Sequence, residues 1–142
     1  MPYLKTYDLF ISHAWKYGDE YTKLENLLKN ANNFYYRNYS APSDKPLHNL
    51  DSTDVKTKTQ IEDAIIRKIL HANIVLVISG MYANNRYWME REIHIASLLN
   101  KPIIAIKPYG HTLMPSYIQK YADEVVNWNT ESIVSAIRRL AI

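Results

Sequence analysis

Residues 73–92 read N-I-V-L-V-I-S-G-M-Y-A-N-N-R-Y-W-M-E-R-E, and the change from strand to helix within them decides the fold. Residues 73–78 are almost wholly apolar and rich in β-branched side chains, which is typical of a strand buried on both faces of a parallel sheet. The apolar run stops at Ser79. Asn84 or Asn85 can then cap the helix that follows. Any chemistry of the chain is expected at this junction.

The helix expected over residues 85–99 carries one carboxylate on its apolar side. The stripe at helical spacing consists of Trp88, Glu92, Ile95 and Leu99. Glu90, by contrast, shares a polar face with Arg86, His94 and Ser97. An inward carboxylate is costly unless it is paired, so Glu92 needs an explanation. It is either a structural group, ion-paired or bonded to backbone N–H groups, or a catalytic or ligand-binding carboxylate.

Length and composition predict a single globular domain over residues 1–142. The chain has no cysteine, which excludes disulfides, thiolate nucleophiles and zinc–thiolate sites, and we predict no metal site. It lacks a long apolar signal segment or membrane span, so we expect a cytoplasmic protein that binds no membrane. The net charge is +3 without a basic stripe interleaved with aromatic residues, so we expect no nucleic-acid binding.

Strand and helix patterns alternate along the whole chain. Strands are expected at residues 7–11, 33–39, 74–78, 103–106 and 124–128. Helices are expected at about 19–30, 57–71, 85–99, 116–121 and 131–141. A long loop at 40–56 separates the second strand from the second helix, and loops of this length are usually functional or mobile.

This alternation predicts an α/β fold with a doubly wound, five-stranded parallel sheet and helices on both faces. The strand order 2-1-3-4-5, that of flavodoxin-like folds, is expected at this size, and its switch point lies between strands one and three. Residues 12–15 (S-H-A-W) then lie beside residues 79–82 (S-G-M-Y), with Glu92 behind them. The loop 40–56 is expected to form one wall of the resulting crevice.

Two common functions of such sheets are disfavoured. The chain has three glycines and neither a G-x-G-x-x-G nor a Walker A motif, so Rossmann dehydrogenases and P-loop enzymes do not fit. Ser79 stands where the acceptor aspartate of a phospho-receiver domain would be expected.

Nearly the whole chain resembles the TIR domain. The resemblance rests on Y-D-L-F-I-S-H-A-W at 7–15, the apolar strand ending in Ser79, and Y-x4-Y-W-x3-E at 82–92. Three further segments are similar to the TIR-like proteins of bacterial Thoeris anti-phage systems: N-Y-S-A-P at 38–42, I-x3-I-x3-I at 61–69 and N-K-P-I-I-A-I at 100–106.

The sequence also departs from the TIR pattern. Met89 replaces the cysteine common after the tryptophan, and the F-W box and the R-D-x-x-x-G of animal signalling loops are missing. These departures weaken a scaffold role like that of immune adaptors.

The resemblance implies an enzyme that cleaves NAD, with Glu92 as the catalytic residue. NAD would be a substrate and not a permanently bound cofactor, and the product would be ADP-ribose or a cyclic isomer that activates a separate Thoeris effector. One carboxylate suffices for this chemistry, because nicotinamide leaves as a neutral molecule and needs no general acid, unlike the alcohol of an O-glycoside. The candidate substrate-binding residues are Ser12, His13, Trp15, Ser79, Tyr82, Arg86 and Trp88.

Two other functions stay open. The chain could be a non-catalytic TIR-like interaction module, in which Glu92 is an ion-pair residue and the loop 40–56 is a docking surface. It could also be a nucleoside deoxyribosyltransferase, which shares the layout and uses a glutamate nucleophile. The TIR resemblance further implies assembly into a homo-oligomer on activation, with the number of subunits left open.

Overall fold

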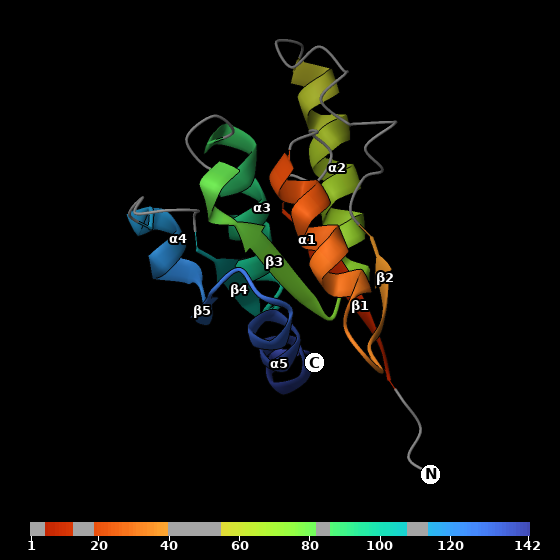
Figure 1. Cartoon of the computed structure of the whole chain (residues 1–142). Helices are drawn as coiled ribbons and strands as arrows, with labels where there is room; N and C mark the ends of the chain where they lie inside the picture. Colours follow the sequence, from red (N-terminus) through yellow and green to blue (C-terminus); the bar gives the residue numbers. More distant parts are fainter. Residues whose placement is uncertain (1–4, 13–18, 40–54, 82–85, 108–113) are drawn as a thin grey trace.

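The computed structural model describes residues 5–12, 19–39, 55–81, 86–107 and 114–142 (Figure 1). Its centre is a five-stranded sheet with the order β2-β1-β3-β4-β5, in which all neighbouring strands are parallel. The strands are β1 (Thr6–Ile11), β2 (Tyr35–Asn38), β3 (Ile74–Ile78), β4 (Ile103–Ile106) and β5 (Glu124–Val126). The predicted flavodoxin-like α/β fold and its strand order are confirmed.

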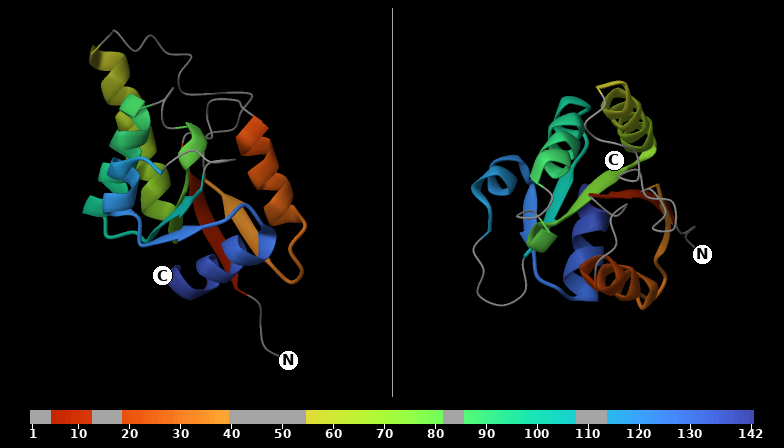
Figure 2. Two further views of the ribbon diagram at one scale, coloured as in Figure 1. Left: turned by 60° about the vertical axis from the view of Figure 1, so that its left-hand side comes forward. Right: turned by 90° about the horizontal axis from the view of Figure 1, so that it is seen from above.

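Helices cover both faces of this sheet, as expected for a doubly wound fold. They are α1 (Asp19–Lys29), α2 (Val55–His71), α3 (Arg86–Leu98), α4 (Ser116–Tyr121) and α5 (Thr130–Leu140), with a short 3-10 turn η2 (Ser79–Met81) after β3. Figure 2 shows α2 and α3 on one side of the sheet and α1 and α5 on the other. In the part of the chain described here, no helix has the length and apolar character needed to cross a membrane.

The largest differences from the predicted boundaries concern β2, β5 and α2. The second strand is shorter than 33–39, because Asn33 has a φ of 55°, in the left-handed region that a strand excludes. The last strand ends at Val126, since the side chain of Asn129 already caps α5 by accepting a hydrogen bond from the Ser132 N–H. Helix α2 begins at Val55, two residues earlier than predicted. The rest of the predicted loop, residues 40–54, and the proposed caps Asn84 and Asn85 lie outside the described residues.

The centre of the sheet is completely buried. All five residues of β3 and the last three of β1, Leu9 to Ile11, are at most 1% exposed. Burying each such side chain stabilises the fold by about 1.5–3 kcal/mol, so these two strands are strongly held in the core. The residues at their carboxyl ends are therefore attached to a rigid frame.

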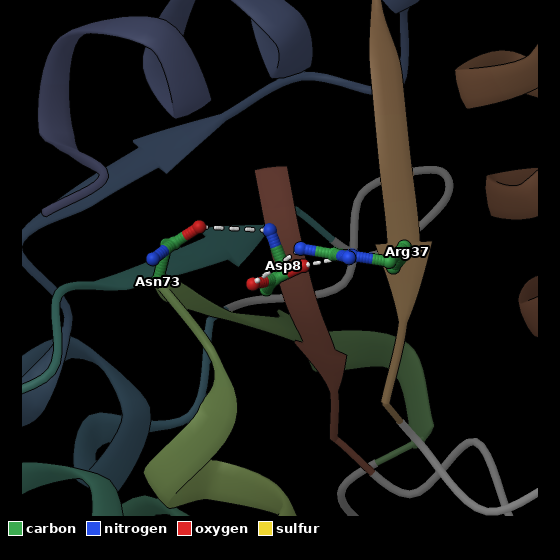
Figure 3. Close-up of polar contacts among 3 residues, drawn as sticks. All are labelled: Asp8, Arg37 and Asn73. Atoms are coloured by element: carbon green, nitrogen blue, oxygen red, sulfur yellow. Dashed lines mark hydrogen bonds and ion pairs between the residues drawn. The ribbon is translucent and has the colours of Figure 1, made fainter. Parts of the chain in front are cut away.

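Asn73, directly before β3, fixes the start of β1 (Figure 3). Its side-chain Oδ1 accepts the Asp8 N–H at 2.8 Å, and its own N–H donates to the Asp8 carbonyl at 2.6 Å. On β2, Arg37 binds the Asp8 carboxylate through two nitrogens, at 2.7 and 3.3 Å, and this hydrogen bonding raises the pKa of Arg37. These contacts set the register of β1 against both of its neighbours.

We predict that Asn73→Ala lowers the free energy of unfolding by about 1–3 kcal/mol, because the partly buried Asp8 N–H loses its acceptor. Urea denaturation followed by circular dichroism measures this change. Asn127→Ala is the matched control, since Asn127 is exposed. We expect this control to change stability by no more than about 0.5 kcal/mol. Equal effects of the two substitutions would contradict the role of Asn73.

Candidate active site

Two buried serines mark the carboxyl ends of the central strands. Ser12 directly follows β1 and is 0% exposed, and Ser79 directly follows β3 and is 3% exposed. The Ser12 N–H donates to the Leu76 carbonyl at 2.7 Å, so pairing between β1 and β3 continues to Ser12. Because β1 and β3 are parallel neighbours, both serines lie at the same edge of the sheet. This edge contains the switch point, where open α/β sheets bind their ligands.

Glu92 of α3 reaches this edge from the helix layer. It is 0% exposed, and its Oε1 accepts a hydrogen bond of 2.6 Å from the Ser12 hydroxyl. The two residues are 80 positions apart in the sequence. The structure therefore places Glu92 facing inward, behind the end of β1, as its position on the helix indicated.

The buried face of α3 is broader than the predicted stripe. Trp88 and Ile95 are buried, but the most deeply enclosed apolar residues are Met89, Ile93 and Ala96, each 0% exposed. Leu99 is only partly buried and lies beyond the end of the helix. Glu92 is thus surrounded along its helix by apolar residues, so its carboxylate gains little from water and depends on protein hydrogen bonds.

The two arginines of α3 form ion pairs with other carboxylates. Arg86 Nε binds Glu90 Oε2 at 3.1 Å on the outer face of the helix, which agrees with the predicted polar face. A nitrogen of the Arg91 guanidinium binds Glu62 Oε1 on α2 at 2.8 Å. Arg86 is largely exposed and Arg91 partly exposed, and exposed pairs of this kind contribute at most about 1 kcal/mol.

The other described candidates, Trp88, Arg86 and Ser79, each have contacts of their own. Trp88, one turn before Glu92, is 8% exposed, with its ring edge-on to Tyr87 at 4.9 Å between centroids. Arg86 lies at the start of α3 and is largely exposed. The Ser79 hydroxyl donates to the sulfur of Met114 at 3.0 Å. Three predicted substrate-binding residues lie outside the described residues: His13, Trp15 and Tyr82.

The segment after β4 also contacts this edge, which the sequence did not indicate. Met114 accepts the hydrogen bond from Ser79, and the Tyr117 hydroxyl of α4 donates to the Glu90 carbonyl at 3.2 Å. Ile118 of the same helix is 0% exposed and fixes it in the core. A short, weakly patterned helix gives no sequence signal for such contacts, so only the structure reveals them.

Other features of the described surface do not combine a buried carboxylate with the carboxyl edge of the sheet. A cavity of about 410 Å³ opens at the amino end of β4, beside Lys101 and Asp123, which is the opposite edge of the sheet from Glu92. A hydrogen bond from Arg139 lowers the pKa of Glu124, and this exposed pair joins α5 to β5 away from the switch point. Among the described residues, no group of three or more His, Asp or Glu side chains is arranged to hold a metal ion. The carboxyl edge at Glu92 is therefore the candidate active site.

Fold and site together define a class of protein: a flavodoxin-like α/β domain with a buried glutamate behind its switch point. The family model described as "Thoeris protein ThsB, TIR-like domain" matches residues 10–112, which is most of the chain. The chain therefore belongs to the Thoeris ThsB TIR-like family, as its motifs suggested. A search of curated proteins finds no match.

A solved structure of known function shares this fold. The chain resembles the 2-deoxyribosyltransferase from the psychrotolerant bacterium Bacillus psychrosaccharolyticus with a TM-score of 0.59 and 13% sequence identity. The similarity covers 85% of this chain and 87% of that enzyme. At this identity, the likeness concerns the fold alone.

We predict that Ser12 and Glu92 are energetically coupled. Ser12→Ala should lower the free energy of unfolding by about 1.5–3 kcal/mol, because the buried carboxylate loses a donor. In a Glu92→Met background the same substitution should cost much less, since no carboxylate is left without that donor. A double-mutant cycle by urea denaturation measures the coupling. Additivity within about 0.5 kcal/mol would show that the contact contributes nothing.

Proposed function

We propose that this protein cleaves the nicotinamide N-glycosidic bond of NAD and makes a cyclic ADP-ribose-type signal in anti-phage defence. Membership of the Thoeris ThsB family supports a defence-related, TIR-like role. The observation that carries the enzymatic part is the Glu92 carboxylate, fully buried and hydrogen-bonded to Ser12 at the carboxyl edge of the sheet. Open α/β sheets bind their ligands at this edge, so a buried carboxylate there is well placed to act on one.

The chemistry proposed for NAD requires one anion and no acid. The bond between ribose C1′ and the pyridinium nitrogen breaks, and its electron pair neutralises that nitrogen, so nicotinamide leaves uncharged. Positive charge then develops on the ribose ring, where the Glu92 carboxylate stabilises it. A preorganised group of this kind contributes on the order of 3–4 kcal/mol to transition-state stabilisation, about a hundred- to a thousandfold in rate.

The fate of the ribosyl cation decides the product. Capture by water, which then loses a proton, gives ADP-ribose. Capture by a hydroxyl of the adenosine ribose, with loss of its proton, gives a cyclic isomer that can act as a signal to a separate effector. A site closed to water favours the second outcome. The apolar residues of α3 around Glu92 support a dry environment of this kind.

Other groups at this edge are proposed to bind NAD. Trp88 lies one turn before Glu92, and its aromatic ring suits contact with the nicotinamide or adenine ring. Arg86 at the start of α3 suits a phosphate, because a guanidinium can bind two phosphate oxygens at once. Its ion pair with Glu90 is exposed and weak enough to be exchanged for such a ligand. Ser79 is proposed to contact the substrate at the end of β3.

The test compares nucleotide pools in phage-infected cells that express the wild type, Glu92→Gln or Glu131→Gln. Glu131 is exposed at the start of α5, across the sheet from α3, so Glu131→Gln is the matched control. We predict that the wild type and the control consume NAD and form a new ADP-ribose isomer, detected by chromatography and mass spectrometry. Glu92→Gln should keep the fold and lose at least about a hundredfold in product formation.

Two results would contradict this function. Normal product formation by Glu92→Gln would remove the catalytic role of the carboxylate. Unchanged nucleotide pools in cells whose defence is triggered, together with stoichiometric binding of a protein partner, would support the interaction module instead. Transfer of a base between deoxynucleosides, without loss of NAD, would identify a deoxyribosyltransferase.

A further inference from the structure

The place of Ser12 is fixed by backbone pairing and not by a loop. Its N–H donates to the Leu76 carbonyl of β3 at 2.7 Å, directly after the paired residues Ile11 and Leu76. Leu9, Phe10 and Ile11, which precede it, are at most 1% exposed. The Ser12 side chain therefore starts from a backbone that the core holds in one position.

The helix that carries Glu92 is also held on several sides. Ile93 and Ala96 are fully buried in the core. Arg91 is ion-paired to Glu62 on α2, and the Tyr117 hydroxyl of α4 donates to the Glu90 carbonyl. The contact between Ser12 and Glu92 thus joins two elements that are each fixed independently of it.

The chemistry of the contact defines what Ser12 can do. A serine hydroxyl has one proton, and Ser12 uses it to donate a hydrogen bond of 2.6 Å to Glu92 Oε1. Its length is within the range of hydrogen bonds from a hydroxyl to a charged carboxylate, which are about twice as strong as neutral ones. Towards a ligand, this hydroxyl can then only accept a hydrogen bond. Its donor function is directed entirely at the carboxylate.

A glutamate carboxylate needs such a partner to keep one orientation. The last torsion of its side chain is broad, so packing of the methylene groups alone leaves the plane of the two oxygens free to turn. A bond from a fixed strand residue to one oxygen restrains that plane. Catalytic groups must be held within about 0.5 Å and 10–20° of their productive geometry, so this restraint matters for rate.

We propose that Ser12 is a positioning residue of Glu92: its hydroxyl holds one carboxylate oxygen and so helps to set the orientation in which the carboxylate meets the ribose of NAD. This inference rests on the proposed NAD cleavage and adds a residue to it. Ser12 acts through Glu92 and does not donate to the substrate. Its removal should therefore affect the rate of bond cleavage more than the binding of NAD.

The test uses initial rates of nicotinamide release against NAD concentration, in desalted extracts of infected cells normalised to the amount of the protein. We expect Ser12→Ala to lower kcat about 10- to 100-fold, as loss of a hydrogen bond to a charged group does, with little change in KM. Ser12→Thr keeps the hydroxyl and should restore most of kcat. Ser12→Cys, with a weaker donor, should fall between Thr and Ala. Thermal unfolding confirms that each variant is folded.

Ser97→Ala is the control for the loss of a serine hydroxyl near the core. Ser97 lies on α3, five residues after Glu92 and partly buried, and its substitution should leave kcat unchanged. Wild-type kcat in Ser12→Ala, with Glu92→Gln inactive, would overturn the positioning role and leave the proposed function standing. A raised KM at unchanged kcat would also overturn it, because it would make Ser12 a substrate contact. Wild-type rates in Glu92→Gln would instead refute the proposed function itself.

Discussion

The burial of one carboxylate is the constraint that explains this site. Glu92 is 0% exposed, and an ionised group in that position must be compensated by the protein. Part of the compensation comes from Ser12, through a hydrogen bond that joins the end of β1 to the middle of α3. A contact of this kind requires the helix and the strand to keep a fixed distance and register. The packing of α3 against β1 therefore keeps this hydrogen bond in place, and the bond in turn allows a carboxylate to lie within a hydrophobic core.

Contacts at the opposite edge of the sheet also help to fix the site. Asn73 accepts a hydrogen bond from the Asp8 N–H and donates one to the Asp8 carbonyl, which fixes the register of β1 against β3. From there the fully buried residues of β1 lead without irregularity to Ser12. A slip of one residue would turn the strand's side chains to the opposite face and separate Ser12 from Glu92. The geometry of the site is thus determined partly by contacts at the far ends of the strands.

Much of this organisation could be predicted from the sequence because its signals are local. The alternation of strand and helix patterns along the chain predicted the sheet order, and the helical periodicity after residues 74–78 predicted the inward direction of Glu92. The limits of β2 could not be read from composition, because they depend on the left-handed backbone of Asn33. The partners of Ser12 and the contacts of Tyr117 could not be predicted either, since they join elements that only tertiary packing brings together. The catalytic and substrate-binding roles of all the candidate residues, His13, Trp15 and Tyr82 among them, stay predictions.

The most direct test of the central claim, that this carboxylate acts on the ribose of NAD, is a crystal structure of Glu92→Gln soaked with NAD. The substitution keeps the shape of the side chain while removing its charge, so uncleaved NAD should accumulate in the site. We predict that the nicotinamide ribose lies against residue 92 at the carboxyl ends of β1 and β3, with Trp88 beside a base. NAD bound at the opposite edge of the sheet, with residue 92 still enclosed by apolar side chains, would contradict it.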